Sequence, residues 1–136
     1  SPNLVVSQQA CPFWVPLVEN GELDSPGAEF FIKRDIDALF AKDPAIDTVL
    51  LACTHYPLLS PVIQKFLPKG VRLISQGEIV ANKTVDYLKR HPEIENRLQK
   101  TGKTDFWTTD TVEFFEKGAF LFGKKNISAK KLTFSY

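Results

Sequence analysis

One stretch, residues 49–59 (VLLACTHYPLL), constrains the fold of this chain more than any other. Its opening run is apolar and follows a polar turn at residues 43–47, which is typical of a buried parallel strand. Pro57 is typical of the first position of a helix, where its missing N–H costs no hydrogen bond. The pattern therefore predicts that residues 53–55, Cys-Thr-His, lie where a parallel strand ends and a helix begins.

Side chains at this position can contact a bound ligand, because ligands bind at the carboxyl ends of strands in open α/β sheets. Cys53 would lie beside a helix N-terminus, which favours a thiolate, and His55 is two residues away. A cysteine with a nearby histidine is a recognised arrangement for acid–base or nucleophilic catalysis. The alternative is a packing role, because free cysteine is among the most buried residue types. The residues alone leave both interpretations open.

Two stretches carry a resemblance to a known family. The segment ACTHYPLL at residues 52–59 closely resembles the second catalytic-cysteine motif of the glutamate racemases, with Ala52 where glycine is common. The segment ACPFWVPLVE at residues 10–19 resembles the family's Ala-Cys-Pro…Val-Pro-Leu-Val-Glu segment. The resemblance covers the whole chain, but only the later part of a family member.

The resemblance implies a cofactor-independent interconversion of L- and D-glutamate by two cysteines, which supplies D-glutamate for peptidoglycan. It implies that Cys53 is the base towards L-glutamate and that His55 assists this thiol. It also implies that Thr54 binds the substrate carboxylate and that Glu19 lies near the substrate ammonium. The other cysteine and an aspartate–serine pair would belong to the missing half, because Cys11 does not match the family's first motif.

The partners implied by the resemblance are glutamate, the missing N-terminal half of the same protein and, in full-length form, a second copy in a homodimer. No metal is expected. A chain of 136 residues with a net charge of +1 can form a core and gives no reason to expect nucleic acid or an anionic membrane as a partner. Two cysteines are too few for a disulfide framework, and free thiols fit a reducing cytoplasm. The absence of methionine predicts a fragment of a longer protein.

Taken without the resemblance, Glu19 and Cys11 have simpler interpretations. Glu19 ends an apolar run before an Asn-Gly turn, where it would either receive a cationic group at the rim of a strand or loop or be solvated. Cys11 lies in a predicted irregular loop at residues 8–16, without a local histidine or acid. Packing is therefore the favoured role for Cys11.

The rest of the pattern predicts alternating strands and helices, and hence an α/β fold with a parallel sheet and helices on both faces. Strands are predicted at residues 4–7, 46–52, 71–74, 106–109 and 132–134, and helices at residues 26–42, 57–66, 78–90 and 111–122, with a loop at residues 75–77. The resemblance implies flavodoxin-like lobes of the racemase type, incomplete in this chain. Residues 1–74 would form part of the second lobe and carry Cys53, and residues 75–136 would complete the first lobe.

Two alternative functions remain open. One is a related aspartate or amino-acid racemase, although aspartate racemases typically carry an acid where His55 stands. The other is a thiol-bearing binding or structural domain without turnover, which predicts a buried Cys53 with no pocket beside it. A thiol hydrolase or oxidoreductase is disfavoured, because the sequence has no Cys-x-x-Cys and no asparagine or aspartate positioned to complete a triad.

Overall fold

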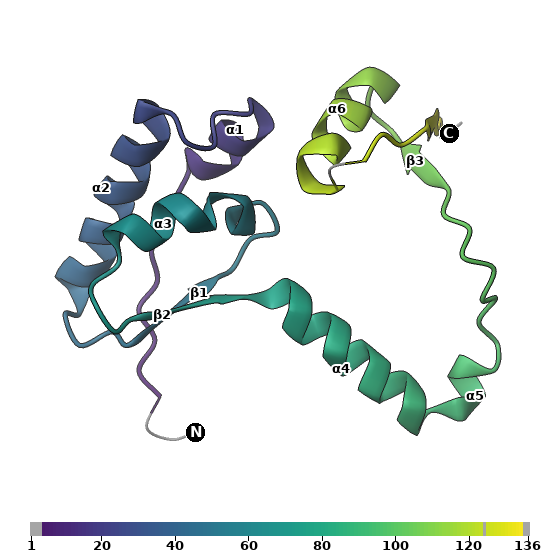
Figure 1. Cartoon of the computed structure of the whole chain (residues 1–136), viewed down its shortest axis with the longest axis horizontal. Helices are drawn as coiled ribbons and strands as arrows, with labels where there is room; N and C mark the ends of the chain where they lie inside the picture. Colours follow the sequence, from purple (N-terminus) through teal and green to yellow (C-terminus); the bar gives the residue numbers. More distant parts are fainter. Residues whose placement is uncertain (1–3, 124, 135–136) are drawn as a thin grey trace. The chain divides into compact units, whose positions relative to one another are not determined.

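The computed structural model describes residues 4–123 and 125–134, and the chain divides into two compact units between Tyr87 and Leu88 (Figure 1). In the first unit, β1 (Thr48–Leu51) pairs in parallel with β2 (Arg72–Ser75). In the second, β3 (Phe106–Thr108) pairs in parallel with β4 (Ala129–Lys131). The predicted α/β class is confirmed, with small parallel sheets. The predicted division into racemase lobes at residue 74 stays a prediction.

Helices connect the strands in both units. The first unit contains α1 (Trp14–Glu19), α2 (Pro26–Lys42), the 3₁₀ helix η1 (Tyr56–Leu59), α3 (Ser60–Phe66) and most of α4 (Gln76–Arg90). The second contains α5 (Pro92–Glu95) and α6 (Val112–Gly123). None of the helices that the model describes is both long enough and apolar enough to cross a membrane.

Local signals in the sequence set the ends of the elements in the first unit. At the start of α2, the Ser25 side chain accepts a hydrogen bond of 3.1 Å from the backbone N–H of Ala28, and Pro26 occupies the first helical position. Between α3 and β2, Gly70 adopts a φ of +93°, which side-chain-bearing residues rarely adopt. Serine at the helix cap, proline at the first helical position and glycine at a positive φ are the residue types that these backbone positions favour.

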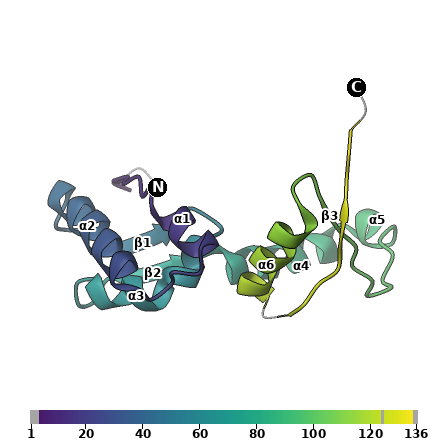
Figure 2. The same ribbon diagram turned by 90° about the horizontal axis from the view of Figure 1, so that it is seen from above.

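The hydrophobic core of the first unit joins side chains from α1, α2, β1, η1 and α3. Figures 1 and 2 show α2 and α3 packed together beside the strand pair. The buried members of the core are Trp14, Val18, Ala28, Ile32, Ile36, Leu51, Leu59, Val62 and Ile63. Each large aliphatic side chain contributes about 1.5–3 kcal/mol through its burial, so this core holds α1 and η1 against the same strand.

Burial along β1 differs from the sequence prediction on one face. Val49 and Leu51 are buried, whereas Leu50 between them is 55% exposed. The all-apolar run predicted burial on both faces. The difference arises because, within the described residues, the face of β1 that carries Leu50 is open to solvent.

The predicted strand at residues 4–7 is absent from the described structure. Leu4, Val5 and Val6 are between 73% and 79% exposed, and the segment has no secondary structure. Just after the segment, the Gln8 carbonyl accepts a hydrogen bond of 2.6 Å from the Nζ of Lys42, the last residue of α2. An apolar run forms a strand only where a neighbouring strand supplies partners for its backbone groups.

Two predicted loops differ from the structure. The irregular loop predicted at residues 8–16 ends where α1 begins at Trp14. Pro16 does not prevent this helix, because a proline in the first turn removes no intrahelical hydrogen bond. The loop predicted at residues 75–77 is wrong, since β2 ends at Ser75 and α4 begins at Gln76.

In the second unit, the last strand lies three residues earlier than the predicted residues 132–134. It spans Ala129–Lys131. The backbone N–H of Ala129 donates to the Glu116 carboxylate at 2.8 Å, and the Lys131 Nζ donates to the carbonyls of Thr109 and Asp110 at 2.6 and 2.8 Å. Besides its parallel pairing with β3, β4 is therefore held by hydrogen bonds to α6 and to the β3–α6 turn.

Two leucines on opposite faces of β1 test the position of the core. Leu51 is 3% exposed and Leu50 is 55% exposed. We expect Leu51→Ala to lower the free energy of unfolding by about 2–5 kcal/mol, because it leaves a cavity in the core. The matched Leu50→Ala variant should change it by about 0.5 kcal/mol or less. Urea denaturation followed by circular dichroism measures both, and equal effects would contradict the assigned core.

Candidate active site

The Cys-Thr-His sequence lies at the carboxyl end of β1, where the sequence predicts it. Cys53 comes two residues after the end of the strand, and its Sγ is 4.0 Å from the Nδ1 of His55. The Thr54 hydroxyl oxygen is 3.3 Å from the same nitrogen. Cys53 and His55 are half-buried, whereas Thr54 is exposed. The turn thus places a thiol, a hydroxyl and an imidazole within reach of one another.

A carboxylate completes this arrangement from a distant part of the chain. The Oε1 of Glu19 is 3.5 Å from the Nε2 of His55. The imidazole of His55 therefore has the Cys53 thiol near one ring nitrogen and the Glu19 carboxylate near the other. The structure brings together all four site residues that the sequence analysis names: Glu19, Cys53, Thr54 and His55.

The position of Glu19 corrects one expectation. The sequence places it at the rim of a strand or loop, but it is the last residue of α1. Its side chain is 46% exposed. Because α1 packs against η1 through the core, the end of this helix reaches the turn that carries His55.

The line of carboxylate, imidazole and thiol can move or hold a proton. A carboxylate next to one ring nitrogen stabilises an imidazolium, and an imidazolium next to a thiol stabilises the thiolate. This is the general arrangement by which an adjacent base activates a cysteine. The cluster is therefore suited to proton transfer by Cys53, with His55 as its electrostatic support.

Cys11 has a different environment, and the packing role predicted for it is confirmed. It lies against the core, and its thiol donates a hydrogen bond of 3.6 Å to the Gln9 carbonyl. Burial, with the nearby Asp35 carboxylate as a smaller cause, raises the pKa of the Cys11 thiol from 9.0 to about 12. Asp35 is itself 3% exposed and accepts from the guanidinium of Arg34. Cys11 therefore stays a neutral thiol at physiological pH.

Tyr56 is a residue of the site that the sequence analysis did not single out. Its hydroxyl donates to the Cys11 carbonyl at 3.3 Å, and its ring contacts the Trp14 indole edge-on, with centroids 4.8 Å apart. Burial, followed by the nearby thiols of Cys11 and Cys53, raises the pKa of the Tyr56 hydroxyl. The sequence signal that could have indicated Tyr56 is its position directly after His55 in the segment ACTHYPLL at residues 52–59.

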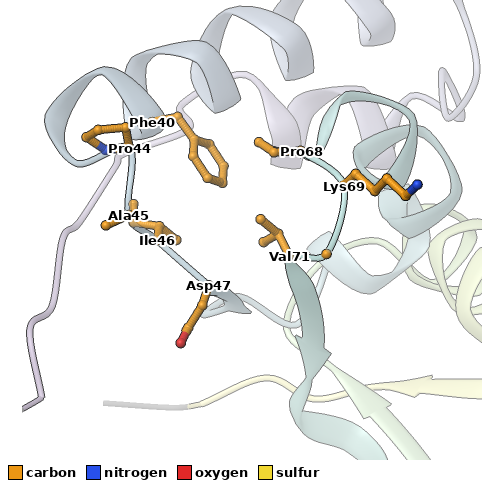
Figure 3. A pocket seen from close by; sticks show the side chains of 9 residues that line it. Phe40, Pro44, Ala45, Ile46, Asp47, Pro68, Lys69 and Val71 are labelled. Atoms are coloured by element: carbon orange, nitrogen blue, oxygen red, sulfur yellow. The ribbon is translucent and has the colours of Figure 1, made fainter.

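A hollow in the first unit lies at the other end of the sheet (Figure 3). Its volume is about 320 Å³, and Phe40, Ile46, Asp47, Pro68, Lys69 and Val71 are among its lining residues. Asp47 and Val71 immediately precede β1 and β2, whereas Cys53 follows the carboxyl end of β1. This hollow is therefore separate from the cluster around His55, and the predicted cleft beside Cys53 stays a prediction.

In the described ranges, 4–123 and 125–134, no group of three or more histidine, cysteine, aspartate or glutamate side chains is arranged to hold a metal ion. The Glu19 carboxylate lies near Nε2 of His55 and the Cys53 thiol lies near Nδ1, so the two groups approach different ring nitrogens and do not converge on one point.

The fold and this cluster define a class of protein: an α/β protein that carries a thiol, an imidazole and a carboxylate at the carboxyl end of a parallel strand. No family model matches the chain. Several curated proteins, however, are similar to it in sequence. The glutamate racemase of Roseobacter denitrificans is 39% identical over 104 residues, which cover 76% of this chain and 36% of that protein. The glutamate racemase of Streptococcus pyogenes serotype M49 is 36% identical over 135 residues, which cover 98% of this chain and 49% of that protein.

Solved structures of glutamate racemases also match the fold of this chain. Glutamate racemase isoform RacE1 from Bacillus anthracis matches 98% of this chain and 48% of its own, with a TM-score of 0.82 and 31% identity. The glutamate racemase from Francisella tularensis, crystallised with D-glutamate, matches 98% of this chain and 49% of its own, with a TM-score of 0.79 and 25% identity. The chain is a glutamate racemase homologue, and it spans about half the length of the enzymes it matches.

The different environments of the two thiols predict different reactivities. Iodoacetamide reacts with thiolates, and the pKa of about 12 keeps Cys11 protonated near neutral pH. We expect Cys53 to be alkylated at least about tenfold faster than Cys11. Mass spectrometry of digested samples measures both rates, with Cys11→Ser and Cys53→Ser variants as controls for peptide assignment. Equal rates, or faster alkylation of Cys11, would contradict the assignment of Cys11 to packing.

The raised pKa of Cys11 also predicts a loss of stability in alkali. The unfolded thiol releases its proton near pH 9.0, whereas the folded thiol keeps it up to a pKa of about 12. The unfolded state therefore binds fewer protons in this range, and the free energy of unfolding falls as the pH rises from 9 towards 12. The raised pKa of Tyr56 acts in the same direction.

Urea denaturation of the wild type and of Cys11→Ala across this pH range measures the effect. The decline with pH should be shallower in Cys11→Ala, because the variant lacks the titrating thiol. Identical pH dependence in the wild type and Cys11→Ala would show that burial of Cys11 does not favour its protonated form.

Proposed function

We propose that this chain is one catalytic half of a cofactor-independent glutamate racemase, which interconverts L- and D-glutamate. The observation that carries the proposal is the line from the Glu19 carboxylate through the His55 imidazole to the Cys53 thiol, at 3.5 and 4.0 Å. The relatives named as glutamate racemases, and the solved relative crystallised with D-glutamate, support glutamate as the substrate.

The chemical problem is the weak acidity of the Cα–H bond of an amino acid. In the proposed direction, the Cys53 thiolate removes this proton from L-glutamate, so that an S–H bond forms and the C–H bond breaks. The electron pair left on Cα is delocalised into the α-carboxylate. A second thiol on the opposite face then delivers a proton to Cα and becomes a thiolate. Proximity and fixed dipoles in a site closed to water lower the energy of the carbanion.

His55 and Glu19 support the thiolate of Cys53 in this proposal. The His55 ring lies 4.0 Å from the sulfur and can assist its proton transfer, and the Glu19 carboxylate, 3.5 Å from the other ring nitrogen, orients the ring. Glu19 is half-exposed, so it can also attract the substrate ammonium. The exposed hydroxyl of Thr54 is available to hydrogen-bond a substrate carboxylate.

We infer that Cys11 is not the second thiol, because it packs against the core and its raised pKa disfavours the thiolate that proton donation would leave. We assign this role to a cysteine in the part of the matching enzymes that this chain does not cover, which the motif resemblance implies is their N-terminal half. The surface of the second unit supports such a partner, since several of its large apolar side chains are exposed. These include Leu98, Trp107, Phe114, Phe120, Leu132 and Phe134. In the complete enzyme, which we propose to be a cytoplasmic homodimer, the product D-glutamate would serve peptidoglycan synthesis and thereby cell shape.

The proposal predicts that the chain alone does not racemise glutamate, because one thiol can serve only one face of Cα. The purified chain is incubated with L-glutamate, and D-glutamate is measured by chiral chromatography. The assay is repeated after co-expression with the N-terminal half of the Bacillus anthracis relative. We expect turnover only in the second case.

Variants connect this turnover to the proposed residues. Cys53→Ala should abolish turnover, and His55→Asn should lower kcat about tenfold or more, a typical contribution of acid–base assistance. Cys11→Ser is the matched thiol control and should retain turnover. Turnover by the chain alone that depends on Cys53 would overturn the two-thiol proposal. Turnover of the co-expressed protein that survives Cys53→Ala would overturn the role of this residue.

A further inference from the structure

Tyr56 links the turn that carries His55 to the beginning of α1. It follows His55 directly in the chain, while its side chain reaches the segment before α1. The Cys11 carbonyl accepts two hydrogen bonds there, one of 3.3 Å from the Tyr56 hydroxyl and one of 3.2 Å from the backbone N–H of Trp14. The Tyr56 ring also packs on the Trp14 indole, with centroids 4.8 Å apart and planes at 61°.

The other end of α1 carries Glu19. This helix has six residues, so its own hydrogen bonds are too few to make it stable, and its position depends on packing. Trp14 and Val18 are 2% and 0% exposed and seat the helix on the core. The Glu19 side chain is 46% exposed and is not held by burial of its own. The distance between Glu19 and His55 therefore depends on how α1 is held against the His55 turn.

We propose that Tyr56 is a positioning residue, and that its hydroxyl bond to the Cys11 carbonyl sets the distance between the Glu19 carboxylate and the His55 imidazole. The proposal rests on the proposed function only in that this pair serves Cys53. It also assigns a purpose to the Ala-Cys-Pro segment. The Cys11 backbone, rather than its thiol, is the group that the site uses.

The alternative is that the core alone positions α1. The hydrophobic contacts of Trp14 and Val18 are not directional, and they permit the helix to shift along or rotate about its axis. A hydrogen bond is directional, and this one is part-buried, so water competes with it only in part. Loss of the hydroxyl should therefore leave the core in place but change where Glu19 points.

The test is an NMR measurement on the whole chain. The nuclear Overhauser cross-peak between the His55 ring protons and the Glu19 side chain is compared in the wild type and in Tyr56→Phe, which keeps the aromatic ring. A displacement of about 0.5 Å is enough to disturb a catalytic arrangement, and we expect the cross-peak to fall to about half or less of its wild-type intensity. The matched control, Tyr87→Phe, removes a hydroxyl from α4 and should leave the cross-peak unchanged.

A second variant separates the hydroxyl from general loosening of α1. Trp14→Phe reduces the aromatic contact but keeps the hydrogen bond from Tyr56, so the cross-peak should remain near its wild-type intensity. An unchanged cross-peak in Tyr56→Phe would overturn the proposal, as would an equal loss in Tyr56→Phe and Trp14→Phe. Loss of cooperative unfolding in Tyr56→Phe would also overturn it, because the hydroxyl would then serve folding rather than positioning.

The proposed function and the positioning role of Tyr56 are overturned by different results. The NMR comparison requires no turnover, so it decides the role of Tyr56 even if the co-expressed wild type forms no D-glutamate. Where turnover is present, we expect Tyr56→Phe to lower kcat more than it changes KM, because the substrate contacts assigned to Thr54 stay intact. Normal kcat together with a weakened cross-peak would support the positioning role of Tyr56, but would overturn the role in turnover that the proposed function gives to the Glu19–His55 pair.

Discussion

The packing of α1 and η1 on the β1–β2 pair is the constraint on which the candidate site depends. Parallel pairing aligns Leu51 with Ser75 and so fixes where β1 ends and the Cys-Thr-His turn begins. Burial of Leu51 and Leu59 then holds both sides of that turn in one core. Because Trp14 and Val18 enter the same core, a helix from the beginning of the chain is brought to the turn. The chemistry of the site thus follows from the hydrophobic contacts beneath it.

The local parts of this arrangement could be predicted from the sequence. The strand before Cys53 and the helical turn at Pro57 follow from patterns within a few residues, as does the cap of α2 at Ser25. The contact between Glu19 and His55 joins residues 36 positions apart, and no local pattern encodes it. The Cys-Thr-His sequence by itself indicates His55 as a partner of Cys53, whereas only the resemblance to the glutamate racemases implies that Glu19 lies near the same site.

The failures of prediction share a physical cause. Residues 4–7 have the composition of a strand, but a strand requires partners for its backbone groups, and the described chain gives them none. Leu50 belongs to an apolar run, yet its face of β1 is open. The strand β4 lies at Ala129–Lys131, where it pairs with β3 and is hydrogen-bonded to α6, and not at the more apolar residues 132–134. In each case, the structure that a segment adopts depends on the elements that pack beside it. This chain spans about half the length of the enzymes it resembles.

The central claim is that Cys53 exchanges a proton with one face of the glutamate Cα. Deuterium uptake at Cα tests it most directly, with the chain co-expressed with the N-terminal half of a relative and assayed by mass spectrometry in heavy water. We expect the wild type to deuterate both enantiomers, and Cys53→Ala to lose uptake from L-glutamate while uptake from D-glutamate persists through the other thiol. Uptake from L-glutamate that persists in Cys53→Ala would contradict proton transfer by Cys53.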